Sequence, residues 1–127
     1  GLTTVEAMCE YNTAMDELLA YAERQPGQFG LIFISEMSDE EYKTHKRDKD
    51  AQKLSNDWLK ANKGRIGKQC VAIAMVTKAS GIMKVAKPIA RMTLKRTMGA
   101  QGDIFFTLEE AQVWLRQQLD AAISEKP

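Results

Sequence analysis

The residues best suited to chemistry lie in one short turn, between the apolar run 70–76 and a helical pattern that begins near residue 79. The turn would bring hydroxyl groups and main-chain amides to a helix N-terminus, where the helix dipole favours an anion. A phosphate or a carboxylate is the ligand that such a site fits. The candidate anion-binding residues are Thr77, Lys78, Ser80 and Gly81. The simpler interpretation, which the sequence favours, is that Ser80 only caps the helix.

A row of basic residues follows on the same helical segment. Its members recur every three or four residues and therefore share one helix face: Lys84, Lys87, Arg91 and Lys95, followed at once by Arg96. Like charges at these spacings cost a few tenths of a kcal/mol per pair, so something should offset them. The acid-rich first or last helix would do so, and so would an anionic ligand or membrane surface. No aromatic residues interleave with this row, which makes nucleic acid an unlikely partner.

No catalytic or cofactor-binding constellation is recognisable. His45 is the only imidazole and lies in a very polar segment, where we expect it to face solvent. The sequence has no nucleophile elbow, Walker motif or dinucleotide fingerprint. Cys9 and Cys70 lack the spacing of a metal site, and we expect both to be reduced core thiols of a cytoplasmic protein. The prediction is a non-enzymatic protein without cofactor or metal.

Apolar periodicity alternates between helix and strand along the whole chain. It predicts helices over residues 2–24, 39–62, 79–98 and 107–123, and strands over 29–35, 69–77 and 103–106. The order αβαβαβα predicts an α/β fold, with a small, mostly parallel sheet flanked by helices in a single domain, 1–127. There is no run of eighteen apolar residues, so we expect no membrane span, and no signal peptide is visible.

Local signals set the expected element boundaries. Capping boxes open three helices, at Thr3–Glu6, Ser38–Glu41 and Thr107–Glu110, and the stop signals are 25–27, 62–64, Gly99 and Gly102. Pro88 predicts a kink or a restart within helix 79–98. The positions expected on the inner face of that helix are Ile82, Val85, Ala86, Ile89, Ala90, Thr93, Leu94 and Thr97.

The charge is unevenly distributed although the net charge is only +1. Residues 1–42 carry nine acids and one base, whereas residues 43–96 carry fifteen bases and three acids. Oppositely charged helix faces that attract each other explain much of this pattern. The remaining excess of bases favours an anionic partner, or head-to-tail self-association through opposite faces.

Four stretches resemble the SpoIIAA-like branch of the STAS superfamily of small bacterial proteins. They are GLTT at the start, LIFIS, VAIAMVT with IARM downstream, and DIFFTLEEAQVWL. Members of this family usually carry a β-hairpin before the first helix, and the sequence has no counterpart of it. The resemblance implies a binding or regulatory role rather than catalysis. Its phosphorylatable serine has no clear match here, because Ser35 and Ser38 lack the Asp-Ser context.

The expected function is thus a non-enzymatic binding or regulatory module, a possible homodimer, that takes a protein partner or a small anionic ligand. One alternative is a carrier of a lipid-like anionic amphiphile. The methionines Met75, Met83, Met92 and Met98 would serve either as core residues or as the lining of a flexible pocket for it. The other alternative is weak nucleic-acid binding through the basic region 43–96.

Overall fold

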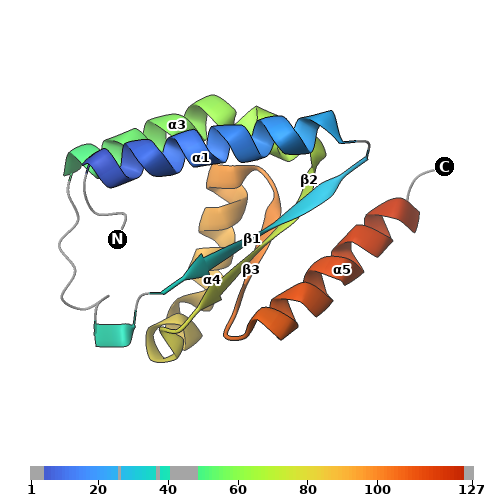
Figure 1. Ribbon diagram of the computed structural model, residues 1–127. Helices are drawn as coiled ribbons and strands as arrows, with labels where there is room; N and C mark the ends of the chain where they lie inside the picture. Colours follow the sequence, from blue (N-terminus) through green and yellow to red (C-terminus); the bar gives the residue numbers. More distant parts are fainter. Residues whose placement is uncertain (1–4, 26, 37, 41–48, 125–127) are drawn as a thin grey trace.

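Helices and strands alternate throughout the part of the chain that the computed structural model describes, which is residues 5–25, 27–36, 38–40 and 49–124 (Figure 1). The elements are α1 Val5–Arg24, β1 Phe29–Ser35, α3 Lys49–Gln69, β2 Cys70–Thr77, α4 Ser80–Met98, β3 Gln101–Phe105 and α5 Leu108–Ser124. This order confirms the predicted α/β class. His45, Glu41 and most of the polar segment 42–50 lie outside the described residues.

The three strands form one parallel sheet in the order β1-β2-β3. Ile32 lies opposite Ala74, which lies opposite Asp103 on the other side. The central strand β2 is buried along most of its length. An uninterrupted apolar run is typical of a strand covered on both faces, and this is the position that Cys70–Thr77 occupies.

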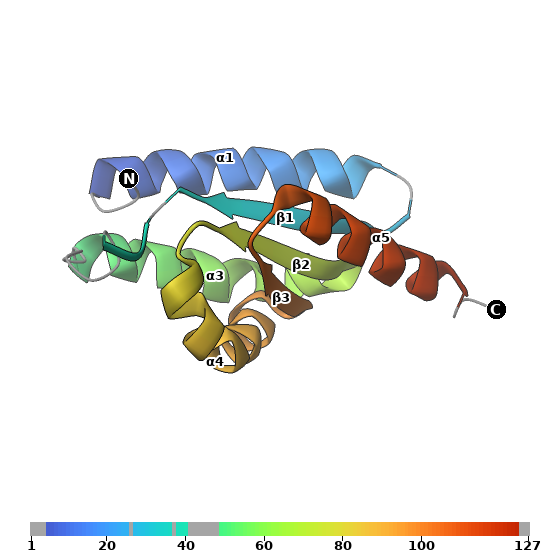
Figure 2. The same ribbon diagram turned by 90° about the horizontal axis from the view of Figure 1, so that it is seen from below.

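Helices cover both faces of the sheet (Figures 1 and 2). Leu19 of α1, Ile66 of α3 and Leu94 of α4 join one apolar cluster with the strand residues Leu31, Ile73 and Ile104. On the opposite face, Ala111 of α5 packs with Ala74 and Val76. Figure 2 shows α5 alone on this second face, whereas α4 packs on the first face, at the β3 edge of the sheet.

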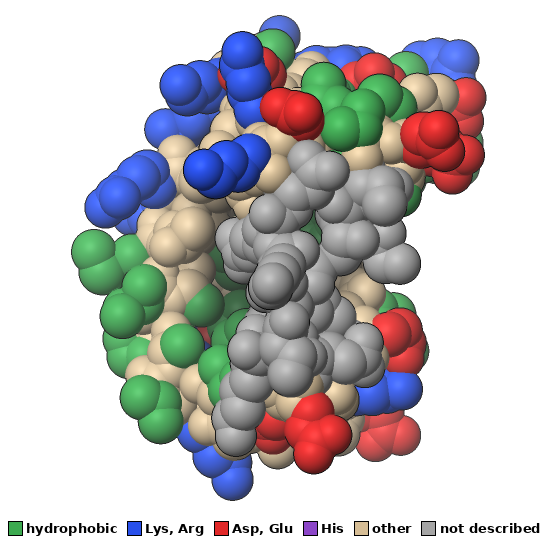
Figure 3. All heavy atoms as spheres, turned by 90° about the vertical axis from the view of Figure 1, so that its left-hand side faces the viewer, with side chains coloured by type: hydrophobic (Ala, Val, Ile, Leu, Met, Phe, Trp, Pro, Cys, Tyr) green, Lys and Arg blue, Asp and Glu red, His purple; other side chains and the backbone are tan. Residues whose placement is uncertain are grey.

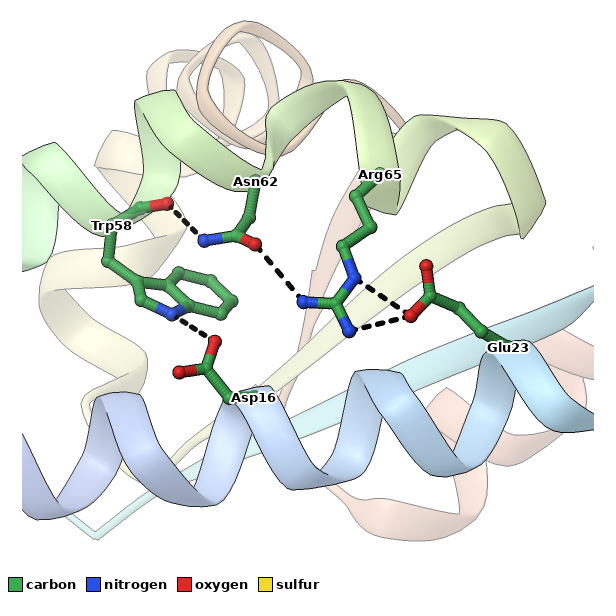
Figure 4. Close-up of polar contacts among 5 residues, drawn as sticks. All are labelled: Asp16, Glu23, Trp58, Asn62 and Arg65. Carbon is green, nitrogen blue, oxygen red and sulfur yellow. Dashed lines mark hydrogen bonds and ion pairs between the residues drawn. The ribbon is translucent and has the colours of Figure 1, made fainter.

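Polar contacts fasten the acidic helix α1 to the basic helix α3 (Figure 4). The Trp58 indole N–H donates to Asp16 Oδ1 at 2.8 Å. Arg65 donates from Nε and Nη2 to Glu23 Oε1 at 2.8 and 2.6 Å. The hydrogen bond from Arg65 lowers the pKa of Glu23. Part of the charge imbalance seen in the sequence is therefore neutralised within the fold.

Helix α3 corrects one predicted boundary. The stop signal at Asn62-Lys63-Gly64 does not end the helix, which continues to Gln69 and leads directly into β2. The physical reason lies beyond the signal, where Ile66 is fully buried in the core and Arg65 binds Glu23. These tertiary contacts outweigh the weak helix propensity of Gly64 and Gly67.

Helix α4 corrects the predicted inner face. It runs through Pro88 as one helix, without the restart that was one of the two expectations. Its buried side carries Leu94, with Met83, Ala90 and Met98 packed against the core. Val85, Ile89 and Thr93 were expected inside and are exposed. The helix is rotated about its axis relative to the prediction, because Lys87 and Arg91, which were expected on the solvent side, reach toward the β3 edge.

Smaller expectations had mixed outcomes. The capping box at α5 is confirmed, since the Glu110 amide donates to Thr107 Oγ1 at 3.2 Å. Gly99 ends α4 in a left-handed conformation, but Gly102 lies within β3. Both cysteines are free, as predicted. Cys70 is buried, whereas Cys9 is exposed on α1 and is not the core thiol that we expected, because the buried side of α1 is formed by its neighbour Met8 and by Met15 and Leu19.

Candidate binding surface on helix α4

The predicted anion-binding turn lies at the carboxyl end of β2 and leads into α4, as the sequence indicated. Its main-chain amides already donate hydrogen bonds to a carboxylate of the same chain. The Gly81 amide lies 3.3 Å from Asp39 Oδ2, and the Ile82 amide lies 3.1 Å from Asp39 Oδ1. The absence of a side chain at Gly81 permits this approach, because a Cβ there would lie 3.1 Å from Asp39 Oδ2. The carboxylate of Asp39 therefore satisfies the helix N-terminus.

The other residues of the turn also have internal partners. Thr77 is only 1% exposed, and its Oγ1 accepts a hydrogen bond from the Ala79 amide at 3.1 Å. Lys78 Nζ lies 2.6 Å from Glu36 Oε2 at the surface. Ser80 begins α4 after Ala79 and makes no side-chain capping bond, so the simpler role expected for it is wrong. An external anion would have to displace Asp39 to use this turn.

The predicted basic face divides into two parts. Arg91 Nε and Nη2 donate to the two carboxylate oxygens of Asp103 at 2.7 and 3.2 Å, and Lys87 Nζ lies 3.8 Å from the same carboxylate. Burial favours the neutral form of Asp103, but the hydrogen bonds from Arg91 and from the Ile104 amide, with the charge of Lys87, lower its pKa. A strand carboxylate thus offsets the charge that we expected an acidic helix to offset.

The remaining basic residues of α4 lie at the surface. Lys84, Lys95 and Arg96 are exposed, and none of them forms an ion pair within the described part of the chain. Helix α4 contains no acidic residue. The helix therefore presents uncompensated positive charge to solvent.

Three large apolar side chains stand beside this charge. Val85 is 84% exposed, Ile89 69% and Met92 63%. Their spacing of four and three residues aligns them along one side of the helix. Hydrophobic side chains protrude on the side of the molecule where α4 lies, along the left edge of Figure 3, below a group of Lys and Arg side chains. We call Val85, Ile89 and Met92 the α4 ridge.

Sequence reasoning missed this ridge because it assigned Val85 and Ile89 to the core. Periodicity shows that a helix has two faces but does not say which of two apolar stripes is buried. Asp103 was the missing signal, since a lone carboxylate on a strand needs a basic partner from a neighbouring element. Pairing it with Lys87 and Arg91 would have turned the ridge outward.

A shallow, open depression of about 450 Å³, which we call the hollow, lies on the opposite face of the sheet, between the end of β3 and α5. Phe105 and Trp114 form its aromatic wall, with ring centroids 5.3 Å apart. The residues that line it are Phe105, Glu109, Glu110, Val113, Trp114 and Gln117. The hollow thus combines apolar surface with two carboxylates. Its charge is negative, whereas the charge on α4 is positive.

Comparison of the chain with family models, curated proteins and solved structures found no match. Within the described residues, no helix has the length and apolar content to cross a membrane. No group of three or more His, Cys, Asp or Glu side chains in the same residues is placed to hold a metal ion.

Proposed function

We propose that this chain is a non-enzymatic binding module that holds a partner on the outward side of α4. The α4 ridge is the observation that carries the proposal. Exposed apolar side chains that occur singly need no explanation, but a group of them rimmed by charge marks an interaction site. Because the rim consists of Lys84, Lys95 and Arg96, the partner is an acidic and partly apolar surface.

We propose further that the chain is related to the SpoIIAA-like branch of the STAS superfamily, which its sequence resembles. The element order αβαβαβα and the parallel sheet agree with a SpoIIAA-like member of the STAS superfamily. That family would supply the regulatory context in which a domain acts by binding another protein. The resemblance concerns the fold alone, so the proposed binding surface is argued from the residues of α4.

The α4 geometry favours surface binding over the carrier alternative. A carrier of an anionic amphiphile encloses the apolar tail of its ligand in a cavity. Met83 packs against the core cluster, whereas Ile89 is 69% exposed, so these two residues lie on different sides of the helix and do not line one cavity. A small anionic ligand at the turn 77–81 would compete with Asp39.

Position-specific photo-crosslinking tests the proposal. The full chain would carry Ile89→p-benzoylphenylalanine, with Ile123→p-benzoylphenylalanine as a matched control, because Ile123 of α5 is 68% exposed. After irradiation in a cell lysate, we expect adducts at position 89 well above those at position 123. The additional changes Lys84→Glu and Arg96→Glu should remove them. Equal adduct yields at the two positions would contradict the proposal.

A further inference from the structure

We infer that the α4 ridge binds a second copy of this chain, which receives it in the hollow between β3 and α5. The inference rests on the proposed function, because it names the occupant of the same surface. It also assigns a role to the hollow, which the proposed function leaves unused.

The hollow has the chemistry to accept an apolar side chain that has cations beside it. Phe105 and Trp114 offer half-buried ring surface, and Val113 is 59% exposed at its border. Glu109 and Glu110 stand at the start of α5. The Lys87 Nζ of the same chain lies 5.8 Å from the centre of the Phe105 ring, so this ring already accepts one cation.

The α4 ridge is complementary to the hollow in polarity and charge. With Ile89 and Met92 against the aromatic wall, Lys95 and Arg96, three and four residues beyond Met92, come near the carboxylates of Glu109 and Glu110. Apolar contact at the centre with opposite charges at the rim is the arrangement found in protein interfaces.

The two surfaces cannot meet within one molecule. Helix α4 packs on the face of the sheet that α1 and α3 share, whereas α5 covers the opposite face (Figure 2). The ridge is exposed because it points away from the core. The contact is therefore head-to-tail between copies, and each added copy leaves one ridge and one hollow free. Such contacts generate closed rings or open filaments rather than a symmetric dimer.

Complementary variants test this geometry. Ile89→Asp disables the ridge, and Val113→Asp disables the hollow; both side chains are exposed, so the fold should be retained, which far-UV circular dichroism would verify. Sedimentation velocity over a concentration series should show the unmodified chain forming species larger than a dimer. Each variant alone should be monomeric, with association weakened about tenfold or more by the unpaired carboxylate. Ile123→Asp, outside the hollow, should associate like the unmodified chain.

Mixing the two variants gives the decisive result. The intact ridge of one variant can enter the intact hollow of the other, so an equimolar mixture should form a 1:1 complex and nothing larger. A mixture that stays monomeric, or an unmodified chain that is monomeric throughout, would overturn the inference.

Photo-crosslinking separates this inference from the proposed function. Purified chain with p-benzoylphenylalanine at position 89 should form an adduct with itself, located by mass spectrometry in segment 105–117. If the purified chain forms no adduct while the lysate gives adducts specific to position 89, the self-association is wrong and the proposed binding module is retained. If neither preparation gives adducts, both fail.

Discussion

Asp39 and Asp103 each bring a carboxylate to groups that would otherwise be open to an external anion. Asp39 accepts from the first amides of α4, and Asp103 binds Lys87 and Arg91. Each aspartate comes from an element different from the one it binds, so each also fixes the position of α4. A single substitution at either residue should change both anion affinity and stability.

Replacing Asp39 tests the anion site at α4. Asp39→Ala should lower the free energy of unfolding by about 1 kcal/mol, the usual cost of a lost helix cap. Because the freed amides of Gly81 and Ile82 can then take an external anion, sodium sulfate should raise the melting temperature of the variant more than that of the unmodified chain. Thermal unfolding in sulfate and in chloride at equal ionic strength measures this. Equal sulfate effects on both proteins would show that the turn does not bind anions.

The ion pairs of Asp103 predict a pH dependence. Its pKa is lowered in the fold, so its contribution to stability is complete above the pKa of the unfolded chain, about 3.9, and is lost as the pH falls through the lower folded value. Asp103→Asn should therefore cost about 1 kcal/mol at pH 7 and little once the carboxyl is protonated. Urea unfolding between pH 2.5 and 7 measures the difference. Asp57→Asn, on the exposed surface of α3, is the control and should change stability little at any pH.

The two cysteines should differ sharply in reactivity. Burial raises the pKa of Cys70 to about 11, so at pH 8 only about one thiol in a thousand is the reactive thiolate. Cys9 is exposed. Iodoacetamide at pH 8 should therefore modify Cys9 rapidly and Cys70 only after denaturation, as followed by peptide mass spectrometry. Rapid labelling of Cys70 in the folded chain would mean that β2 opens more readily than its burial implies.

At the scale of elements, the order, number and type of helices and strands were predictable because each has a strong local pattern. Strand β2 is a continuous apolar run, and α5 begins with a capping box. The end of α3 and the rotation of α4 were not predictable, because contacts distant in sequence decide both. Burial of Ile66 extends α3 past Gly64, and Asp103 holds Arg91 at the β3 edge of the sheet. The candidate site moved to the α4 ridge for the same reason. That the ridge faces solvent became clear only once the ion-pair partner of the basic residues was known.

The packing of α5 on β1 depends on a glycine. A Cβ at Gly30 would lie 2.6 Å from Cδ1 of Leu115, which is buried beneath the helix. Gly30→Ala should therefore cost about 1–3 kcal/mol through overpacking, and less in a Leu115→Ala background, which a double-mutant cycle by urea unfolding would measure.

Gly64 offers a control of opposite sign for Gly30→Ala. It lies inside α3 with nothing within 4 Å of its added Cβ. Gly64→Ala should stabilise the chain by about 0.5–1 kcal/mol, because alanine loses less backbone entropy in a helix. Equal costs at the two positions would contradict the packing argument.

At the scale of the whole molecule, the acidic first third and the basic middle of the chain meet where α1 lies on α3. Glu23 binds Arg65, and Asp16 binds the Trp58 indole. Among the described residues, Asp103 is the one carboxylate that forms ion pairs with the basic side chains of α4, and Lys84, Lys95 and Arg96 keep the excess charge. The uneven charge of the sequence thus gives a molecule in which α1 and α3 partly neutralise each other, while α4 keeps a basic surface.

This arrangement predicts that α1 is the helix most easily released from the fold. It packs mainly on α3, and of its three buried residues, Met8, Met15 and Leu19, only Leu19 belongs to the core cluster shared with the sheet. The double variant Trp58→Phe and Arg65→Met keeps most of the side-chain volume and removes the two contacts between side chains of α3 and α1, leaving the hydrogen bond from Asn12 to the Leu54 carbonyl. Amide exchange in α1 should then quicken by roughly tenfold, while exchange in β2 stays nearly unchanged, because local opening needs less free energy than global unfolding.

Hydrogen–deuterium exchange with peptide mass spectrometry measures this release. Lys60→Met is the control, because Lys60 is exposed on α3 and removing it deletes one positive charge without touching Asp16 or Glu23. The control should leave exchange in α1 as it is in the unmodified chain. If exchange in β2 quickens as much as in α1, the two polar contacts stabilise the entire fold, and α1 is not a separately opening unit.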